Sequence, residues 1–257
     1  MLPDIPLTGE RTAPGRDTEN YWFVRHLACY EWAAAHLNAD LNAHLNARED
    51  PGPILDAGAG EGYGARLLAE ACGRAVCAVE LDAPTTCHIR ARYRELLTVR
   101  ANLIGLPFTD ASFAAVVSLQ VVEHIWDPVQ YLRELARCTN GSVILSTPNR
   151  PVHSPDLMPG GRPENPFHVR EFDSEELTEL LHTAAPERLV RLFGLHHGPR
   201  IRAWEERHGS LPQELIDSTN DDDATATHVL DFASTLDASD FRIEATTAGA
   251  HDLVALW

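Results

Sequence analysis

A glycine-rich segment near residue 60 carries residues suited to binding a ligand. In ILDAGAGEGYG, residues 54–64, an apolar run ends at Asp56, and glycines follow at every second position from Gly58 to Gly64. A strand that ends in such a turn and opens a helix lets the backbone approach a ligand, and the helix N-terminus favours polar or anionic groups. The segment therefore predicts a ligand site.

The spacing of these glycines argues against two common nucleotide motifs. The dinucleotide fingerprint G-x-G-x-x-G would need glycine at position 63, where Tyr63 stands. The G-K-[ST] end of a phosphate-binding P-loop is also absent. Asp56 would repel a pyrophosphate but attract an ammonium group. The loop thus indicates a ligand with a cationic end.

Two polar residues follow at the ends of later strands. Glu80 ends the second predicted strand, about 20 residues after the glycines, where an acidic side chain accepts hydrogen bonds from ribose hydroxyls. Asn102 follows the third predicted strand and could meet an adenine edge. Together with Asp56, they predict a nucleoside that carries a cationic tail.

The elements that must position these residues alternate along the chain. Because apolar runs alternate with helical patterns, the sequence predicts right-handed βαβ units and a parallel, Rossmann-like α/β sheet. The predicted strands are residues 53–57, 75–80, 96–101, 113–119 and 142–147, with further strand-like runs at 188–195 and 252–257.

Several segments outside this core have distinct patterns. A helix is expected over residues 21–45, and a second over 173–184, with Asp173 as its cap and Glu176 three residues on. Residues 196–251 form an acidic insert, whose NDDDATAT stretch at 220–227 is expected to be a solvated loop. We expect one domain, divided into an N-terminal arm and helical lid (1–48), a core (49–195), the insert (196–251) and a last strand (252–257).

Composition narrows the class of protein. The 257 residues carry a net charge of −17, which disfavours nucleic-acid binding because an acidic surface repels phosphates. The five cysteines include no C-x-x-C pair, so reduced thiols in a cytoplasm fit best. The N-terminus lacks the pattern of a signal peptide, and no apolar run approaches the roughly 20 residues of a membrane span. A homodimer is compatible with the sequence but not specified by it.

The motif D-A-G-A-G-E-G, then Glu80, then ANLIGLPFTDASFAAVVS resembles the class I S-adenosylmethionine (SAM) methyltransferases over roughly residues 50–185. The resemblance implies a seven-stranded sheet whose last two strands are antiparallel. It implies that Asp56 and the Gly58–Gly62 backbone hold the methionine end of SAM, Glu80 the ribose, and Asn102 with the Leu103 backbone the adenine. Asn102 replaces the commoner Asp. The remaining residues assigned to SAM in this core are Ala57, Gly60, Tyr63, Leu81 and Gln120.

Four segments are similar to a narrower group, the actinobacterial sugar O-methyltransferases that build polymethylated polysaccharides of the methylmannose and methylglucose types. These segments are TGERTAPGRDTENYWFVRH, STPNR, NPFHVREF and LFGLHHGPRIRAWEERHG. This resemblance covers most of the chain but is weak beyond residue 210. It implies a sugar hydroxyl of a small oligosaccharide as the acceptor. A small phenolic, quinone-type or other natural-product acceptor and a non-catalytic SAM-binding module remain as alternatives.

A sugar hydroxyl has a high pKa, so a base should take its proton as the bond to the methyl group forms. His124, in SLQVVEHIWDP, lies just past the fourth strand and is the first candidate, with Glu123 either orienting it or facing away. His168, on a loop expected to cover the acceptor, is the second, and His196 with His197 the third. These histidines could instead pack beneath loops.

Mg²⁺ is a rival partner for this region, because some sugar methyltransferases use it to bind adjacent hydroxyls. Mg²⁺ prefers carboxylate and water oxygens, and no acidic cluster has a suitable spacing. No residue is therefore assigned as a metal ligand, and Mg²⁺ dependence stays open.

Two further groups of residues complete the prediction. The N-terminal ENYWFVRH is expected to fold over the donor, with Tyr21 and Trp22 closing the pocket and Arg25 pairing with the SAM carboxylate. Aromatic faces and forked donors suit pyranose rings. Residues expected to face the acceptor are Trp126, Arg150, His168, Arg170, His196, His197, Arg200 and Trp204.

Overall fold

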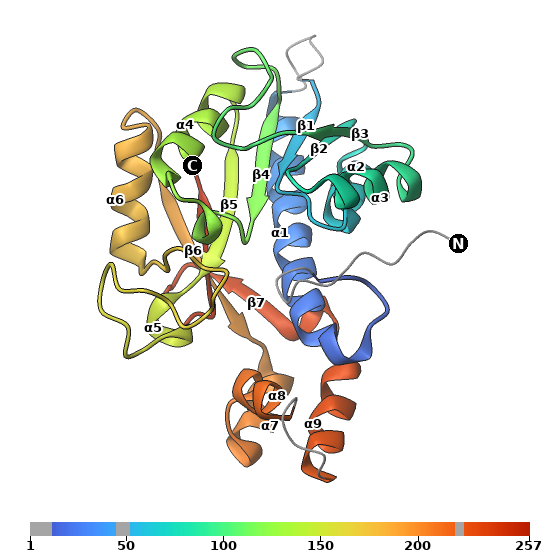
Figure 1. The fold of residues 1–257 in the computed structure, drawn as a ribbon, viewed down its shortest axis with the longest axis vertical. Coiled ribbons are helices and arrows are strands. Elements are labelled where there is room, and N and C mark those ends of the chain that lie inside the picture. Colours follow the sequence, from blue (N-terminus) through green and yellow to red (C-terminus); the bar gives the residue numbers. More distant parts are fainter. Residues whose placement is uncertain (1–11, 45–51, 219–223) are drawn as a thin grey trace.

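A mixed β-sheet forms the centre of the molecule. The computed structural model describes residues 12–44, 52–218 and 224–257. Within these residues the sheet has the order β3 (Leu97–Arg100), β2 (Val76–Glu80), β1 (Ile54–Ala57), β4 (Ala115–Leu119), β5 (Val143–Pro148), β8 (Asp252–Leu256), β6 (Arg191–His197) and β7 (Phe241–Glu244) (Figure 1). Each pair from β3 to β5 is parallel, whereas β8 is antiparallel to both β5 and β6. The predicted Rossmann-like α/β fold is confirmed.

The strand count differs from the prediction. Seven strands were expected, and the described residues contain an eighth, β7, which pairs antiparallel with β6 at the edge of the sheet. Its four residues, FRIE, lie inside the segment that the sequence assigns wholly to an insert. A run of four residues that includes two charged ones is too short to show a strand pattern distinct from the acidic sequence around it.

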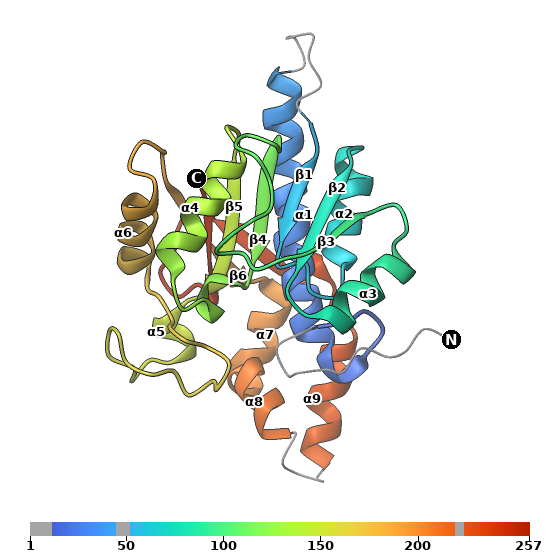
Figure 2. The ribbon, with the colours of Figure 1, turned by 45° about the horizontal axis from the view of Figure 1, so that its top comes forward.

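Helices cover both faces of the sheet, and alternate residues of the strands face them. One core joins Ile54 and Val76 to α1 (Asn20–His44), α2 (Tyr63–Cys72) and α3 (Ala83–Arg92). The other joins Leu55 and Cys77 to α4 (Pro128–Cys138) and α6 (Ser174–Ala184). Figures 1 and 2 show α4 and α6 on the side of the sheet away from α1 and α2. Because side chains alternate along a strand, Asp56 faces α1.

The start of α6 follows the predicted cap. The Asp173 side chain accepts hydrogen bonds from the backbone N–H of Glu175 and Glu176, and the Glu176 carboxylate accepts one from the Asp173 backbone. This reciprocal capping box satisfies N–H groups that the first turn leaves unpaired. Short helical turns η1 (Asp17–Glu19), η2 (Val122–His124) and α5 (Arg150–His153) lie in the connections.

The segment between β6 and β8 is mainly helical. It contains α7 (Pro199–His208), α8 (Leu211–Ser218), α9 (Ala224–Ser234) and η3 (Ala238–Asp240), and these helices lie beyond one end of the sheet, beside the N-terminal part of α1 (Figures 1 and 2). Part of the predicted loop at 220–227 lies outside the described residues, and Ala224 begins α9. No helix among the described residues is both long and apolar enough to cross a membrane.

Candidate active site

A cavity of about 430 Å³ lies where β1, β2 and β4 end, beside the glycine loop. Most of the residues predicted to bind SAM line it, as does the first candidate base, His124. The lining residues from the prediction are Gly58, Gly60, Tyr63, Glu80, Leu81, Asn102, Leu103, Gln120 and His124. The carboxyl edge of the sheet therefore brings together residues from four separate segments of the chain.

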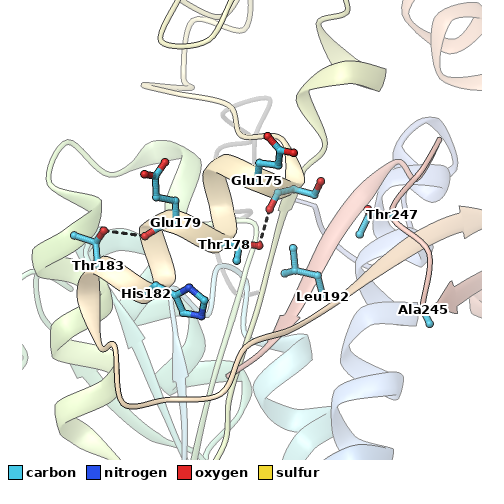
Figure 3. Close-up of a pocket in the computed structure, with 9 residues that line it drawn as sticks. Glu175, Thr178, Glu179, His182, Thr183, Leu192, Ala245 and Thr247 are labelled. Carbon is cyan, nitrogen blue, oxygen red and sulfur yellow. Dashed lines mark hydrogen bonds between the residues drawn. The ribbon is translucent and has the colours of Figure 1, made fainter.

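A larger groove of about 760 Å³ lies elsewhere, between α6, β6 and the segment before β8 (Figure 3). None of the predicted site residues lines it. The Thr178 and Thr183 hydroxyls donate to carbonyls of their own helix, and Glu175 and Glu179 are exposed to solvent (Figure 3). The two threonine hydroxyls are thus engaged within α6, and the groove contains none of the predicted site residues, so the smaller cavity is the candidate site.

The glycine loop needs glycine for two physical reasons. Gly58, Gly60 and Gly62 have φ values of 88°, 53° and 101°, a left-handed region that other residues rarely adopt. A Cβ on Gly58 would also lie 2.6 Å from the Val121 side chain, and one on Gly62 would lie 2.9 Å from the Tyr93 ring. Glycine at these positions therefore lets the loop, which we call the glycine cradle, pack closely against both side chains.

Glu80 holds this loop against the end of β2. Its carboxylate accepts hydrogen bonds from the backbone N–H of Gly60 at 3.1 Å, Leu81 at 2.9 Å and Asp82 at 3.1 Å. The Asn102 side chain turns back to accept from the Ile104 N–H at 3.2 Å. Both residues thus lie at the cavity where a ribose and an adenine were predicted to bind.

Gln120, at the end of β4, is one of two described residues other than glycine with a positive φ, 55°. Its side-chain amide donates to the Ser146 hydroxyl at 3.0 Å, which anchors the strained backbone beside the cavity.

Asp56 lies behind the cavity rather than in its lining. It is fully buried, and the Tyr30 hydroxyl lies 3.3 Å from each of its carboxylate oxygens. Burial raises the pKa of Asp56 to about 7, although the Tyr30 hydrogen bond acts in the opposite direction. Ala57 is also outside the lining, in the core beneath α4. Asp56 therefore does not line the cavity. Tyr30 lines it instead, and the Tyr30 hydroxyl contacts the Asp56 carboxylate.

The N-terminal helix reaches the cavity with different residues from those predicted. The predicted Tyr21, Trp22 and Arg25 do not line it, whereas His26 and Tyr30 do. Arg25 is buried in an ion pair with Asp252, so its charge is already balanced within the protein. The i, i+4 spacing of His26 and Tyr30 places both on one helix face, and this spacing was the signal in the sequence that could have identified them.

A small hydrogen-bonded group extends this contact to the N-terminal arm. The Thr12 hydroxyl lies 2.8 Å from the Tyr63 hydroxyl, and the His26 Nδ1 lies 3.4 Å from both. Thr12 lines the cavity as well. The arm, the N-terminal helix and the glycine loop therefore meet at one wall of the cavity.

His124 is placed and oriented as a proton acceptor would be. Its Nδ1 lies 3.0 Å from the Phe167 carbonyl oxygen. Because a carbonyl only accepts, Nδ1 carries the proton in the neutral ring, and Nε2 bears the lone pair. The group that fixes this tautomer is thus a backbone carbonyl 43 residues away, and not the neighbouring carboxylate that the sequence suggested.

Glu123 and His168 lie beside His124. Glu123 is 1% exposed, which raises its pKa, and its carboxylate accepts from the Thr147 hydroxyl at 3.0 Å. The Glu123 backbone carbonyl accepts from the Val169 N–H at 2.7 Å, which ties the 165–171 loop to η2. The rings of His124 and His168 lie 5.1 Å apart. Two of the base candidates are therefore neighbours in space, although they lie far apart in the sequence.

The arginines predicted to face the acceptor already have partners. Arg150 is buried in ion pairs with Asp173 and Glu176, and Arg170 also pairs with Glu176. Arg200 pairs with Asp240. These guanidinium groups hold loops and helix ends, so their prediction as sugar ligands is not supported by their contacts.

The other predicted acceptor residues differ in their exposure. Trp204 is 4% exposed and stacks on Phe232, while His197 is buried between Tyr21 and Glu205. His196 is half-buried, and its Nε2 lies 3.0 Å from the Thr246 carbonyl oxygen.

Trp126, just past His124 in the chain, is 87% exposed. Of the two tryptophans predicted to face the acceptor, it is the one that offers an open aromatic face. Phe167, which was not predicted, lines the cavity and is 49% exposed. The aromatic side chains available to an acceptor therefore lie near His124 rather than in the insert.

Known proteins similar in sequence to this chain are methyltransferases, which agrees with a SAM-binding cavity beside the glycine loop. A family model described as a methyltransferase domain matches residues 26–184. A probable S-adenosylmethionine-dependent methyltransferase of Mycobacterium tuberculosis is 46% identical over 209 residues, covering 80% of this chain and 69% of that protein. A relative of the same description from Mycolicibacterium smegmatis is 44% identical over 209 residues, covering 80% of this chain and 74% of its own.

Solved structures share the fold at low identity. A SAM-dependent methyltransferase of Thermotoga maritima aligns with a TM-score of 0.54 at 14% identity, covering 93% of this chain and 96% of that one. A geranyl diphosphate methyltransferase in complex with SAM aligns with a TM-score of 0.53 at 17% identity, covering 96% and 93%. At such low sequence identity, the similarity shows a shared fold.

Proposed function

Because this chain belongs to the S-adenosylmethionine-dependent methyltransferases, we propose that it transfers the methyl group to a sugar hydroxyl of an oligosaccharide, with His124 as the base. SAM supplies a methyl group carried on a sulfonium, which makes the methyl carbon electrophilic. The observation that carries the proposal is the placement of His124 in the wall of the cavity with its Nδ1 bound to the Phe167 carbonyl.

The cavity fits the SAM cofactor through the features of its own backbone. Gly58 and Gly60 line it with backbone alone, which lets a ligand approach closely, and Glu80 lies in the same lining. In this proposal the glycine loop and Gln120 hold the amino-acid end, Glu80 the ribose, and Asn102 with Leu103 the adenine. Tyr30 would transmit the charge of the buried Asp56 to the cavity through its hydroxyl.

His124 would act on the acceptor and leave the donor untouched. Its Nε2 accepts the proton of the attacking hydroxyl, and the imidazolium that forms is stabilised by the Phe167 carbonyl and by the nearby Glu123 carboxylate. The protein otherwise orients the two reactants and excludes water. In this mechanism the protein side chains carry out a single proton transfer.

Exposed aromatic side chains in and near the cavity favour a sugar over a phenol. Trp126 is 87% exposed and Phe167 is 49% exposed, and exposed aromatic faces suit the C–H faces of a pyranose ring. A small phenol would instead favour an enclosed apolar pocket. The resemblance of ENYWFVRH, STPNR and NPFHVREF to the sugar O-methyltransferases supports the same acceptor class.

A substrate screen tests the proposal. Labelled SAM is offered with partly methylated mannose and glucose oligosaccharides, and with small phenols as the competing acceptor class, and the linkage of any product is read by NMR. We expect label in a sugar methyl ether. Label in phenols alone would replace the sugar assignment with the phenolic one, whereas turnover of neither class would favour a SAM-binding module without catalysis.

A further inference from the structure

Three side chains that commonly bind metal ions meet beside the cavity. Glu123, His124 and His168 each place one ligand atom within 4.8 Å of the others. Glu123 and His124 come from η2, and His168 comes from the loop that the Glu123 backbone carbonyl binds. The sequence assigned no metal ligands, because this set forms only when the loop at 165–171 folds back onto η2.

The hydrogen bonds around the two imidazoles fix the same tautomer in each. His124 Nδ1 faces the Phe167 carbonyl at 3.0 Å, and His168 Nδ1 faces the Glu171 carboxylate at 2.7 Å. Both acceptors place the proton on Nδ1 and the lone pair on Nε2. Metal-binding histidines use this arrangement, in which a carbonyl or carboxylate accepts from the nitrogen that does not bind the ion.

Charge at this cluster also favours a cation. Glu123 is 1% exposed and Glu171 is 3% exposed, so two carboxylates are buried beside two imidazoles. Among the described residues, Glu171 Oε2 is buried and accepts no hydrogen bond. Buried carboxylates are normally balanced by a partner of opposite charge, and a divalent cation held at this cluster would supply positive charge beside both of them.

We propose that Glu123, His124 and His168 form a binding site for a divalent first-row transition-metal ion of the zinc type, and that an ion bound there inhibits methyl transfer. One carboxylate and two imidazoles form a ligand set that Zn²⁺ favours, whereas Mg²⁺ prefers oxygen ligands. The inhibitory part rests on the proposed function, because coordination would occupy the His124 Nε2 lone pair that the base needs. The ion would also displace the Asn165 amide, which lies 3.1 Å from His168 Nε2.

Calorimetric titration of the chelator-treated protein with Zn²⁺ tests the site without any substrate. The variants are His168→Gln, which removes one ligand, and His182→Gln, a control on the exposed surface of α6 (Figure 3). We expect wild type and His182→Gln to share one tight site, and His168→Gln to bind there at least about tenfold more weakly. Equal affinity in all three proteins would overturn the site, and so would stronger binding of Mg²⁺ than of Zn²⁺.

Co²⁺ provides a second readout that does not depend on activity. Its visible absorption reports imidazole coordination, so a band seen in wild type and in His182→Gln should be lost in His168→Gln. A band of equal intensity in His168→Gln would contradict the assignment of His168 as a ligand.

The activity of metal-free protein separates this proposal from the proposed function. Turnover without metal would support His124 as the base, and added Zn²⁺ should then inhibit wild type at lower concentrations than His168→Gln, each compared with its own zinc-free rate. Absent sugar turnover together with normal Zn²⁺ binding would overturn the proposed function and leave the site intact. Stimulation by Zn²⁺ would overturn the inhibitory part.

Discussion

The glycine loop and the insert at 196–251 differ in what their distinctive residues contact. In the loop, Gly58 and Gly60 line the cavity with backbone alone, and Gly58 and Gly62 let the chain pack closely on Val121 and Tyr93. In the insert, Trp204 and Arg200 are engaged by Phe232 and Asp240 of the same insert. A glycine pattern at the end of a strand therefore indicates where the backbone can contact a ligand. An aromatic residue or an arginine in an insert does not indicate a ligand by itself, because it can equally stabilise the fold.

The strongest test of whether catalysis depends on the cavity rather than on the insert is to remove the proposed base. Substitution His124→Ala should lower kcat about 1000-fold, since a general base contributes roughly 10² to 10⁴. The dissociation constant of SAM should change little, because the substitution leaves the glycine cradle intact. Single-turnover kinetics and calorimetry measure the two quantities. A normal kcat would exclude His124, and an equal loss in His182→Ala would point to a general defect.

Two tryptophans allow the next comparison. Trp204→Ala should destabilise the fold by about 3–5 kcal/mol, the usual cost of emptying a buried aromatic site, without changing the affinity for SAM. Trp126→Ala should leave the unfolding free energy within about 0.5 kcal/mol of wild type, because Trp126 is 87% exposed, while raising the KM for a sugar acceptor. Urea denaturation and steady-state kinetics distinguish the two outcomes. Reversed behaviour of the pair would mean that the insert contains the acceptor site.

The glycine loop offers a smaller and more specific test. Gly58→Ala should weaken SAM binding about tenfold, which is about 1.4 kcal/mol, because the new Cβ would press on Val121 in the cavity wall. Gly73→Ala is the matched control, since Gly73 also has a positive φ, 62°, but a Cβ added there would meet no atom within 4 Å. Calorimetry should show normal SAM affinity for the control. Equal losses in both variants would trace the effect to backbone strain.

Local features of the fold and site were predictable, and contacts between distant segments were not. The strand containing Asp56, the cap at Asp173 and the place of Glu80 follow from short patterns of apolar, glycine and capping residues. The Phe167 carbonyl on His124 depends on a loop closure over 43 residues, which no spacing encodes. Arg25 shows the same limit, because its partner Asp252 lies at the other end of the chain.

The smallest expected effect concerns Arg200, whose predicted role at the acceptor conflicts with its ion pair. Arg200→Gln should lower the unfolding free energy by at most about 1 kcal/mol, since its side chain is 45% exposed and surface ion pairs contribute little. Acceptor KM and kcat should match wild type. Asp240→Asn should cause a larger loss, because the Asp240 carboxylate also accepts from the Asp237 N–H, and a double-mutant cycle would isolate the share that the ion pair contributes. If Arg200→Gln raised KM while Asp240→Asn did not, Arg200 would bind the acceptor after all, and the insert would join the cavity as part of the active site.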